Sequence, residues 1–382
     1  MDNGFNLLAI YIANGTGIAL MLILLFVSKT KFQRKRVEDR IYLIMCYGII
    51  LGCLCESIGF TVDGHIFPFS RAINYVVNMY LFSFNLLLTL LFTFYIDLGI
   101  YGNPERIKEN YKFHTILAIA LISLNIINLF VPIIYDISAE NVYSRCPLGY
   151  IYYVAIVYYF VTAYRTEKNY EKKYGTRSFF SVYMFLIPIS VGVGLQFLIY
   201  GISVAWLSCG VGLTGLYMMQ QNEMAFIDSL VETYNRQYLD YVISSWTNKG
   251  YSFCGVMLDI DKFKTINDTF GHSEGDNALI TVTNTLKECR NENEWVFRYA
   301  GDEFVILKMT HDKNGLDSYM AKVEKQLKEY SKANLDYILS VSYGSCYFDY
   351  KTDVNSFIQE MDKNMYNMKE EHHSQREEGS DQ

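Results

Sequence analysis

Carboxylates at the ends of two apolar runs are the side chains of this sequence best placed to do chemistry. The first run, residues 255–258, leads into Asp259 and, two positions on, Asp261. A second apolar run follows the adjacent pair Asp302 and Glu303. Proteins usually hold Mg²⁺ through one or two carboxylates plus substrate phosphates. If neighbouring strands bring the two acid groups together, the pattern predicts metal-assisted phosphoryl transfer, in which two ions clamp the attacking and leaving oxygens.

The second acid pair lies at the tip of an expected hairpin. Residues 296–308 consist of two strand-sized apolar runs separated by Ala300, Gly301 and Asp302, which is typical of a tight turn. Gly301 would let the backbone approach a ligand closely. Taken alone, the stretch is better explained as an ordinary acidic turn.

A helix is expected directly after Asp261, and its first N–H groups suit a phosphate. Lys264 would add a positive point charge there. Asn267 and Asp276 lie near expected helix ends, and both residue types are good helix caps. From the residues alone, capping is the simpler role for these two.

The two stretches together resemble the GGDEF family, the diguanylate cyclases. The segments LDIDKFKTINDTFGHSEGD and RYAGDEF carry the resemblance, and their combination is far more specific than either alone. An upstream segment, residues 228–236, resembles the opening DxLTGLxNR of that family, with Val231 and Glu232 departing from it. The resemblance covers roughly residues 224–371 and implies a palm-like α/β fold, a mixed sheet packed by helices.

The resemblance also implies a reaction and a set of site residues. Two GTP molecules are joined into cyclic di-GMP with loss of two pyrophosphates, each 3′-hydroxyl attacking the α-phosphate of the other GTP. One domain holds one GTP, so a homodimer through these domains is implied, with Mg²⁺ or Mn²⁺ as cofactor. Glu303 would be a second metal ligand or would help activate the hydroxyl, Asn267 and Asp276 would bond guanine, and Lys264 and Lys369 would meet the phosphates. The implied set is, for metal, Asp259, the Ile260 carbonyl, Asp302 and Glu303; for catalysis, Asp302 and Glu303; and for substrate, Asn267, Asp276, Lys264, Lys369, Phe263 and Gly301.

Three departures from the family pattern bear on activity. Ala300 replaces the first glycine of GGDEF; if the tip needs a left-handed residue there, alanine costs about 1–2 kcal/mol, and otherwise its methyl group faces solvent without effect. The product-inhibition motif RxxD aligns with residues 291–294, which contain no arginine, so that feedback is expected to be absent. The usual GRN after the last helix is missing, and His373 stands where an arginine would contact phosphate.

Composition divides the 382 residues into a membrane part and a soluble part. Nearly all long apolar runs precede residue 220, so we expect a transmembrane sensory or regulatory domain at 1–220, a GGDEF domain at 221–371 and a polar tail at 372–382, disordered from Glu377. Residues 221–382 hold 17 Lys/Arg and 28 Asp/Glu, and an acidic soluble part argues against nucleic acid as a partner. The eight cysteines show no metal or redox spacing.

Seven stretches are long and apolar enough to cross a lipid bilayer. They lie near 6–28, 41–61, 73–98, 114–134, 149–165, 179–200 and 202–220; six spans with a re-entrant turn is the alternative, because little separates the last two. Fourteen Lys/Arg in loops 29–40, 99–113 and 165–178, against Arg71 and Arg145 in the opposite loops, place the N-terminus outside and the C-terminal domain in the cytoplasm of a multi-pass cell-membrane protein. Glu56 and Asp97 lie in or at the end of spans, close enough to an interface for their side chains to snorkel, which we expect rather than a functional role.

The expected order after the last span is helix 224–246, strand 251–259, helices 262–270 and 275–290, strands 295–299 and 303–309, helix 315–332, strand 336–348 and helix 354–371. The leading interpretation is a membrane-bound diguanylate cyclase controlled by its membrane half. One alternative is a degenerate GGDEF domain that binds GTP or a protein without turnover. Another is a receptor or transporter whose GGDEF-like domain is only regulatory. The signal that the membrane half senses cannot be read from the sequence.

Overall fold

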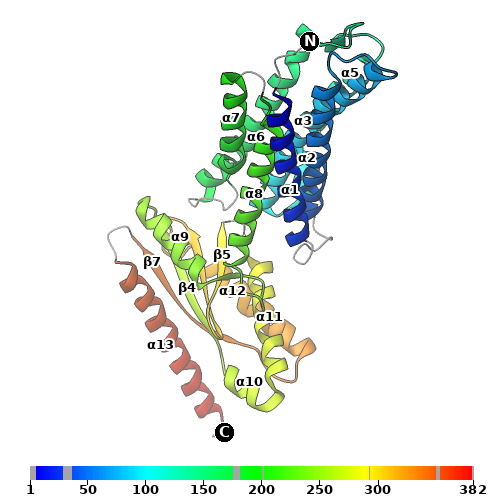
Figure 1. Cartoon of the computed structure of the whole chain (residues 1–382). Helices are drawn as coiled ribbons and strands as arrows, with labels where there is room; N and C mark the ends of the chain where they lie inside the picture. The colour runs from blue at the N-terminus through cyan, green and yellow to red at the C-terminus, as the bar shows by residue number, and fades with distance from the viewer. Residues whose placement is uncertain are drawn as a thin grey trace. The chain divides into compact units, whose positions relative to one another are not determined.

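The computed structural model describes residues 6–28, 37–174, 181–199, 202–291, 293–349 and 353–380. The chain divides into two compact units, one of residues 1–170 and 178–221 and the other of residues 171–177 and 222–382. Each unit is described by itself (Figure 1).

The first unit is almost entirely helical. Its elements are α1 (Leu7–Ser28), α2 (Val37–Val62), α3 (Ser70–Tyr101), α4 (Pro104–Asn110), α5 (Lys112–Ile127), the hairpin β1 (Tyr135–Ile137) and β2 (Tyr143–Arg145), the 3-10 helix η1 (Pro147–Tyr150), α6 (Ile151–Tyr174), α7 (Tyr183–Leu198) and α8 (Ala205–Met224). Helices therefore lie in all seven stretches that the sequence marks as spans.

Three of these helices, α1, α2 and α3, are long and apolar enough to cross a membrane. The pair α4 and α5 passes the same test together but is bent by 69° between them, which allows up to four spans among the described residues. The helix α7 contains a shorter apolar segment, Tyr183–Gln196. Length and composition thus support a membrane anchor, and the count of seven spans stays a prediction.

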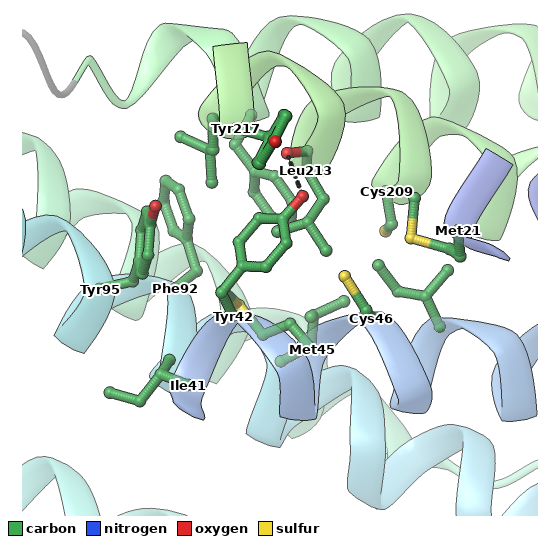
Figure 2. Packing of buried hydrophobic residues seen from close by; sticks show 14 of the residues in the cluster. Met21, Ile41, Tyr42, Met45, Cys46, Phe92, Tyr95, Cys209, Leu213 and Tyr217 are labelled. Carbon is green, nitrogen blue, oxygen red and sulfur yellow. Dashed lines mark hydrogen bonds between the residues drawn. The ribbon is translucent and has the colours of Figure 1, made fainter. Parts of the chain in front are cut away.

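The helices of this unit pack around a shared apolar core rather than facing lipid on every side (Figure 2). Tyr42 of α2 lies at its centre, with Tyr95 and Tyr217 at ring-centroid distances of 6.0 and 6.1 Å. The Tyr42 hydroxyl donates a hydrogen bond to the Leu213 carbonyl on α8, at 3.3 Å. Because a buried hydroxyl needs a partner, this bond fixes α2 against α8.

Glu56 and Asp97 are buried inside the unit, so the snorkelling interpretation is wrong for both. Glu56 accepts hydrogen bonds from Asn14 at 3.0 Å and Ser203 at 2.6 Å. The Asp97 carboxylate pairs with Arg106 at 3.0 Å and accepts a bond from the Tyr111 hydroxyl. Each acid is satisfied by side chains of the unit, as buried charges must be.

The second unit is a five-stranded sheet with helices on both faces. Its elements are β3 (Tyr234–Asn235), α9 (Arg236–Asn248), β4 (Phe253–Ile260), α10 (Phe263–Phe270), α11 (His272–Cys289), β5 (Glu294–Ala300), β6 (Glu303–Met309), α12 (Asp317–Asn334), β7 (Val341–Phe348) and α13 (Val354–Ser380). The strand order is β3-β5-β6-β4-β7. The β3–β5 pair is parallel and the others are antiparallel, so the sheet is mixed, as predicted.

All eight residues of β4 are buried, because alternate side chains face different helices. Val256 and Leu258 join the core formed with α11 and α12. Gly255 lies on the other face, where a side chain would collide with Phe357 and Met361 of α13. Since strand residues alternate between faces, Asp259 also points to the α13 side.

Two predictions about the ends of this unit are wrong. Helix 224–246 does not form as one element: α8 ends at Met224, α9 begins at Arg236, and between them the Asp228 carboxylate accepts bonds from the backbone N–H groups of Leu230 and Val231. Such a turn competes with helix. At the other end, α13 continues to Ser380, so residues 372–380 of the predicted polar tail extend the last helix.

Candidate active site

The two acid groups meet at one end of the sheet, as the strand pattern predicts. Asp259 on β4 is paired in register with Glu303, the first residue of β6. Directly opposite residues of an antiparallel pair have neighbouring side chains on the same face. Asp302 precedes Glu303 in the turn after β5. Asp259, Asp302 and Glu303 are therefore gathered at one end of the sheet, which we call the acid edge.

The electrostatics of this edge favour a bound cation. Burial raises the pKa of Asp259, and the neighbouring Asp302 raises it further, while the bond from Lys369 opposes both. Burial also raises the pKa of Glu303, with the charges of Asp259 and Asp302 adding to the effect. Carboxylates that raise one another's pKa need a positive partner to stay ionised.

Lys369 on α13 supplies that positive charge in this structure. Its Nζ lies 2.7 Å from Asp259 Oδ1. Burial alone would lower the pKa of Lys369, but the bond to Asp259 and the charge of Asp302 outweigh it and raise the pKa. The residue that the resemblance assigns to substrate phosphate is thus at the acid edge already.

The donor set fits a hard divalent cation in its chemistry. Carboxylate and backbone carbonyl oxygens are the ligands that Mg²⁺ takes, and Ile260, whose carbonyl is the fourth expected donor, is the last residue of β4. As the described side chains stand, no group of three or more His, Cys, Asp or Glu is close enough together to hold a metal. In this arrangement the ammonium group of Lys369 balances the charge of Asp259.

The expected nucleotide-binding residues lie on α10 and α11. Asn267 packs against the start of α11, where its Oδ1 would collide with a Cβ at Gly275. Asp276 follows Gly275 directly and is exposed. Asn267 and Asp276 therefore lie near one another, where α10 meets α11. Lys264 lies one turn before Asn267 and is exposed, and Phe263 is half-buried at the first position of α10.

Helix capping does not explain Asn267 or Asp276. The residue before α10 is Lys262 and the residue before α11 is Gly271, and neither helix has a side-chain cap at its N-terminus. Asp276 lies in the second turn of α11. Both side chains are therefore free of the structural role that the sequence alone favoured for them.

The left-handed residue of the hairpin tip is Gly301, not Ala300. Gly301 has φ 49°, and Ala300 is not among the described non-glycine residues with positive φ. Ala300 is the last residue of β5 and pairs with Glu303. Alanine is consequently compatible with this backbone, and the interpretation that its methyl group is without effect is the one that the structure favours.

Arg298 is a residue of this edge that sequence reasoning missed. Its Nε and Nη2 donate to the Gly301 carbonyl at 3.0 and 2.9 Å, and its Nη1 donates to Asp228 Oδ1 at 2.9 Å. The sequence signal that could have indicated a role for Arg298 is its charge, since it lies among the apolar residues at the end of β5.

The aligned position of the product-inhibition motif is occupied by a buried structural pair. Glu294 is 2% exposed and accepts bonds from the backbone and side chain of Asn291 and from Lys308 Nζ. Burial would raise its pKa, but these bonds outweigh burial and lower it. Glu294 is thus committed to the fold rather than presented to a ligand.

Comparisons with known proteins concern the second unit. Residues 225–375 match the family model "Diguanylate cyclase, GGDEF domain". Diguanylate cyclase DosC of Escherichia coli (strain K12) is 31% identical over 148 residues, which are 37% of this chain and 32% of that protein. Diguanylate cyclase A of Treponema denticola is 29% identical over 134 residues, 34% of this chain and 36% of that protein. The chain thus matches about a third of the length of these curated relatives. A solved GGDEF domain, that of DgcB from Caulobacter crescentus in complex with c-di-GMP, aligns at 22% identity and a TM-score of 0.35 over 38% of this chain and 91% of its own.

Proposed function

We propose that this chain, whose residues 225–375 are a GGDEF domain, is a membrane-anchored diguanylate cyclase that makes cyclic di-GMP from two GTP. The observation that carries the proposal is the pairing of Asp259 with Glu303 across β4 and β6, with Asp302 beside them. These are the acids that the family resemblance assigns to the reaction. Relatives named as diguanylate cyclases support the same activity.

The reaction needs a group to receive a proton. The 3′-oxygen of one GTP forms a bond to the α-phosphorus of the other, the bond to the bridging oxygen of the β-phosphate breaks, and pyrophosphate leaves. Glu303 would accept the proton of the attacking hydroxyl. Its pKa is raised by burial and by its acidic neighbours, and a raised pKa makes a carboxylate a better base near neutral pH.

Charge at the transferring phosphate is the other requirement. Asp259, Asp302, Glu303 and the Ile260 carbonyl would hold Mg²⁺ or Mn²⁺, whose charge would neutralise the phosphate oxygens in such a transfer. Lys369 would move from Asp259 to the substrate phosphates when they arrive, because its flexible stem carries a rotatable ammonium group. Lys264 would add a second cation from α10.

Recognition of guanine is assigned to Asn267 and Asp276. An amide and a carboxylate at one corner can bond the edge of a purine that carries both donors and acceptors. Phe263 and Gly301 complete the proposed substrate site, the latter by letting nucleotide lie against the backbone.

The reaction joins two substrates, and one site binds one of them. Two GGDEF domains must therefore face each other, and we propose a homodimer as the active form. The partner domain would present its own GTP. The second phosphodiester bond would then form by the same chemistry as the first, at an identical set of residues.

The helical unit is proposed as a regulatory membrane anchor, with the N-terminus outside and the GGDEF domain in the cytoplasm. Three helices with the length and composition of spans support anchoring in lipid. The helix α8 ends at Met224, and only Ala225, Phe226 and Ile227 separate it from Asp228. A short connection of this kind would pass a displacement of α8 to the start of the GGDEF domain.

A binding domain without turnover is the second candidate. Lys369 on Asp259, together with the missing arginine of GRN, favours it. The retained acids and the compatible backbone at Ala300 favour the cyclase.

The deciding experiment is to incubate the full chain, in nanodiscs, with GTP and Mg²⁺ and to identify products by mass spectrometry. We expect cyclic di-GMP and two pyrophosphates per product. The variant Asp302→Asn should make none, whereas Asp336→Asn, which changes an exposed acid, should behave like the wild type. GTP binding without any cyclic di-GMP would select the second candidate.

A further inference from the structure

The helix α13 packs against β7 and β4, and several of its side chains meet residues of β4 and of the turn that follows this strand. Phe357 and Met361 lie over Gly255, and Lys369 reaches Asp259. One turn further, the ring of His372 reaches Asp261, with Nδ1 3.3 Å from Oδ2. The contact between helix and strand therefore continues past the acid edge to a histidine–aspartate pair.

The carboxylate at this end is held rigidly. Asp261 is 6% exposed, and it accepts hydrogen bonds from Ser340 Oγ at 2.7 Å and Ser342 Oγ at 2.6 Å. The backbone N–H of Asp261 donates to the Ser340 carbonyl at 2.9 Å. A carboxylate that accepts two hydrogen bonds, on a backbone fixed by a third, makes a defined anchor point for any side chain that reaches it.

His372 is the side chain of α13 that reaches this anchor. Its Nδ1 also lies 3.1 Å from Ser342 Oγ. Because Ser342 gives its one hydroxyl proton to Asp261, Nδ1 must carry a hydrogen and donate it to Ser342 Oγ. The ring is therefore held in one tautomer and one orientation.

The sequence around His372 lacks the GRN motif that usually follows the last helix of the family. If His373 occupies the position of the arginine of GRN, then His372 occupies the position of its glycine. Glycine commonly ends helices, whereas α13 continues through this position to Ser380. Because α13 does not end at His372, a side-chain contact at this position can hold the helix on the sheet.

We propose that His372 is a positioning residue: by binding Asp261 it holds the C-terminal turns of α13 on β4 and thereby sets Lys369 at the acid edge. Lys369 lies three residues before His372, and residues at that spacing share a helix face. The part of the proposal that concerns substrate rests on the proposed function, in which Lys369 meets the phosphates of GTP.

The kinetic test compares His372→Ala, His372→Asn and Glu371→Ala in the full chain. Loss of the pair should raise KM for GTP about fivefold, the size expected when a partly exposed polar contact worth up to about 1 kcal/mol is removed. The value of kcat should change less than about twofold, since binding of substrate and transition state weaken together. His372→Asn should restore KM, because its amide nitrogen can replace Nδ1, and Glu371→Ala, which alters an exposed neighbour, should leave it unchanged. A wild-type KM in His372→Ala, or failure of Asn to rescue, overturns the proposal.

Amide hydrogen exchange separates this proposal from the cyclase assignment, because it needs no turnover. His372→Ala should speed exchange in the turns of α13 around Lys369 while leaving α12 unchanged, and His372→Asn should slow it again. Alanine is the best helix former, so faster exchange cannot be blamed on helix propensity. If the chain makes no cyclic di-GMP but exchange follows this pattern, the anchor stands and the cyclase proposal fails. Unchanged exchange in His372→Ala removes the anchor whatever the activity.

Discussion

Arg298 ties Asp228 to the tip of the acidic hairpin. Its guanidinium donates to Asp228 Oδ1 at 2.9 Å through one nitrogen and to the Gly301 carbonyl through two others. Both charged side chains are largely buried, at 16% and 24% exposure. Asp228 follows closely after α8, and Gly301 adjoins Asp302. The Arg298 side chain therefore links the segment after α8 to the turn that carries Asp302.

We therefore predict that Asp228 and Arg298 are energetically coupled. In a double-mutant cycle with Asp228→Ala and Arg298→Ala, the interaction free energy should be about 1 kcal/mol, near the upper range for ion pairs that are not fully buried. The exposed pair Lys325 and Glu329, 3.9 Å apart, is the matched control and should show almost none. Activity should fall in Arg298→Ala because the hairpin tip loses two hydrogen bonds. Strictly additive effects on unfolding at Asp228 and Arg298 would refute the link.

The second prediction contrasts the two residues of the hairpin tip. Gly301→Ala should lower kcat roughly tenfold, because forcing alanine into a left-handed conformation costs about 1–2 kcal/mol and about 1.4 kcal/mol is a decade in rate. Ala300→Gly should leave kcat and KM unchanged, since the backbone there has no positive φ. Steady-state kinetics of both variants decide it; an activity gain in Ala300→Gly would mean that the tip changes conformation when nucleotide binds.

The third prediction is that cyclic di-GMP does not inhibit through the usual remote site. Arginine makes bidentate contacts to phosphate that asparagine cannot make, and Glu294 is already bound to Asn291 and Lys308. Product added to initial-rate assays should act as a simple competitor with GTP at most. Tight non-competitive inhibition would contradict this account.

Glu294 should also make the GGDEF domain sensitive to acid. Its folded-state pKa lies below the ordinary value, so its contribution to the free energy of unfolding is present above about pH 4.3, the unfolded pKa, and is lost as pH falls through the folded pKa. Calorimetry of wild type and Glu294→Gln should show the difference between their unfolding temperatures shrinking as pH is lowered from above about 4.3 to well below 4. A constant difference would show that the carboxylate charge is not what stabilises this position.

The sequence predicted much of the second unit because its signals are local. The apolar runs flanking Gly301 define the β5–β6 hairpin, and strand alternation places Asp259 and Glu303 on one face. The predictions from sequence are wrong where a side chain that is distant along the chain determines the local structure. The segment after Met224 looks helical, yet Asp228 turns it by bonding backbone amides and Arg298. The burial of Glu56 depends on Asn14 and Ser203, which are remote along the chain, and the run of α13 past the expected end depends on a strand contact that no periodicity shows.

The acid edge should be a source of strain as well as of catalysis. Burial and the charges of Asp259 and Asp302 raise the pKa of Glu303, so the folded state prefers a neutral group there, and stability from this site is lost as pH rises through that pKa. Without metal, Glu303→Gln should therefore unfold at the same temperature as wild type or higher, which calorimetry can measure. A clear fall in unfolding temperature would mean that Glu303 has a structural role instead.

The amount of cyclic di-GMP that equal quantities of folded wild type and Glu303→Gln form from GTP and Mg²⁺, in nanodiscs, tests the central claim most directly. The proposed chemistry predicts steady product formation by the wild type and none detectable from Glu303→Gln, with unchanged yield of membrane-inserted protein. Product from both at similar rates would contradict the assignment of Glu303, and product from neither would contradict the cyclase itself.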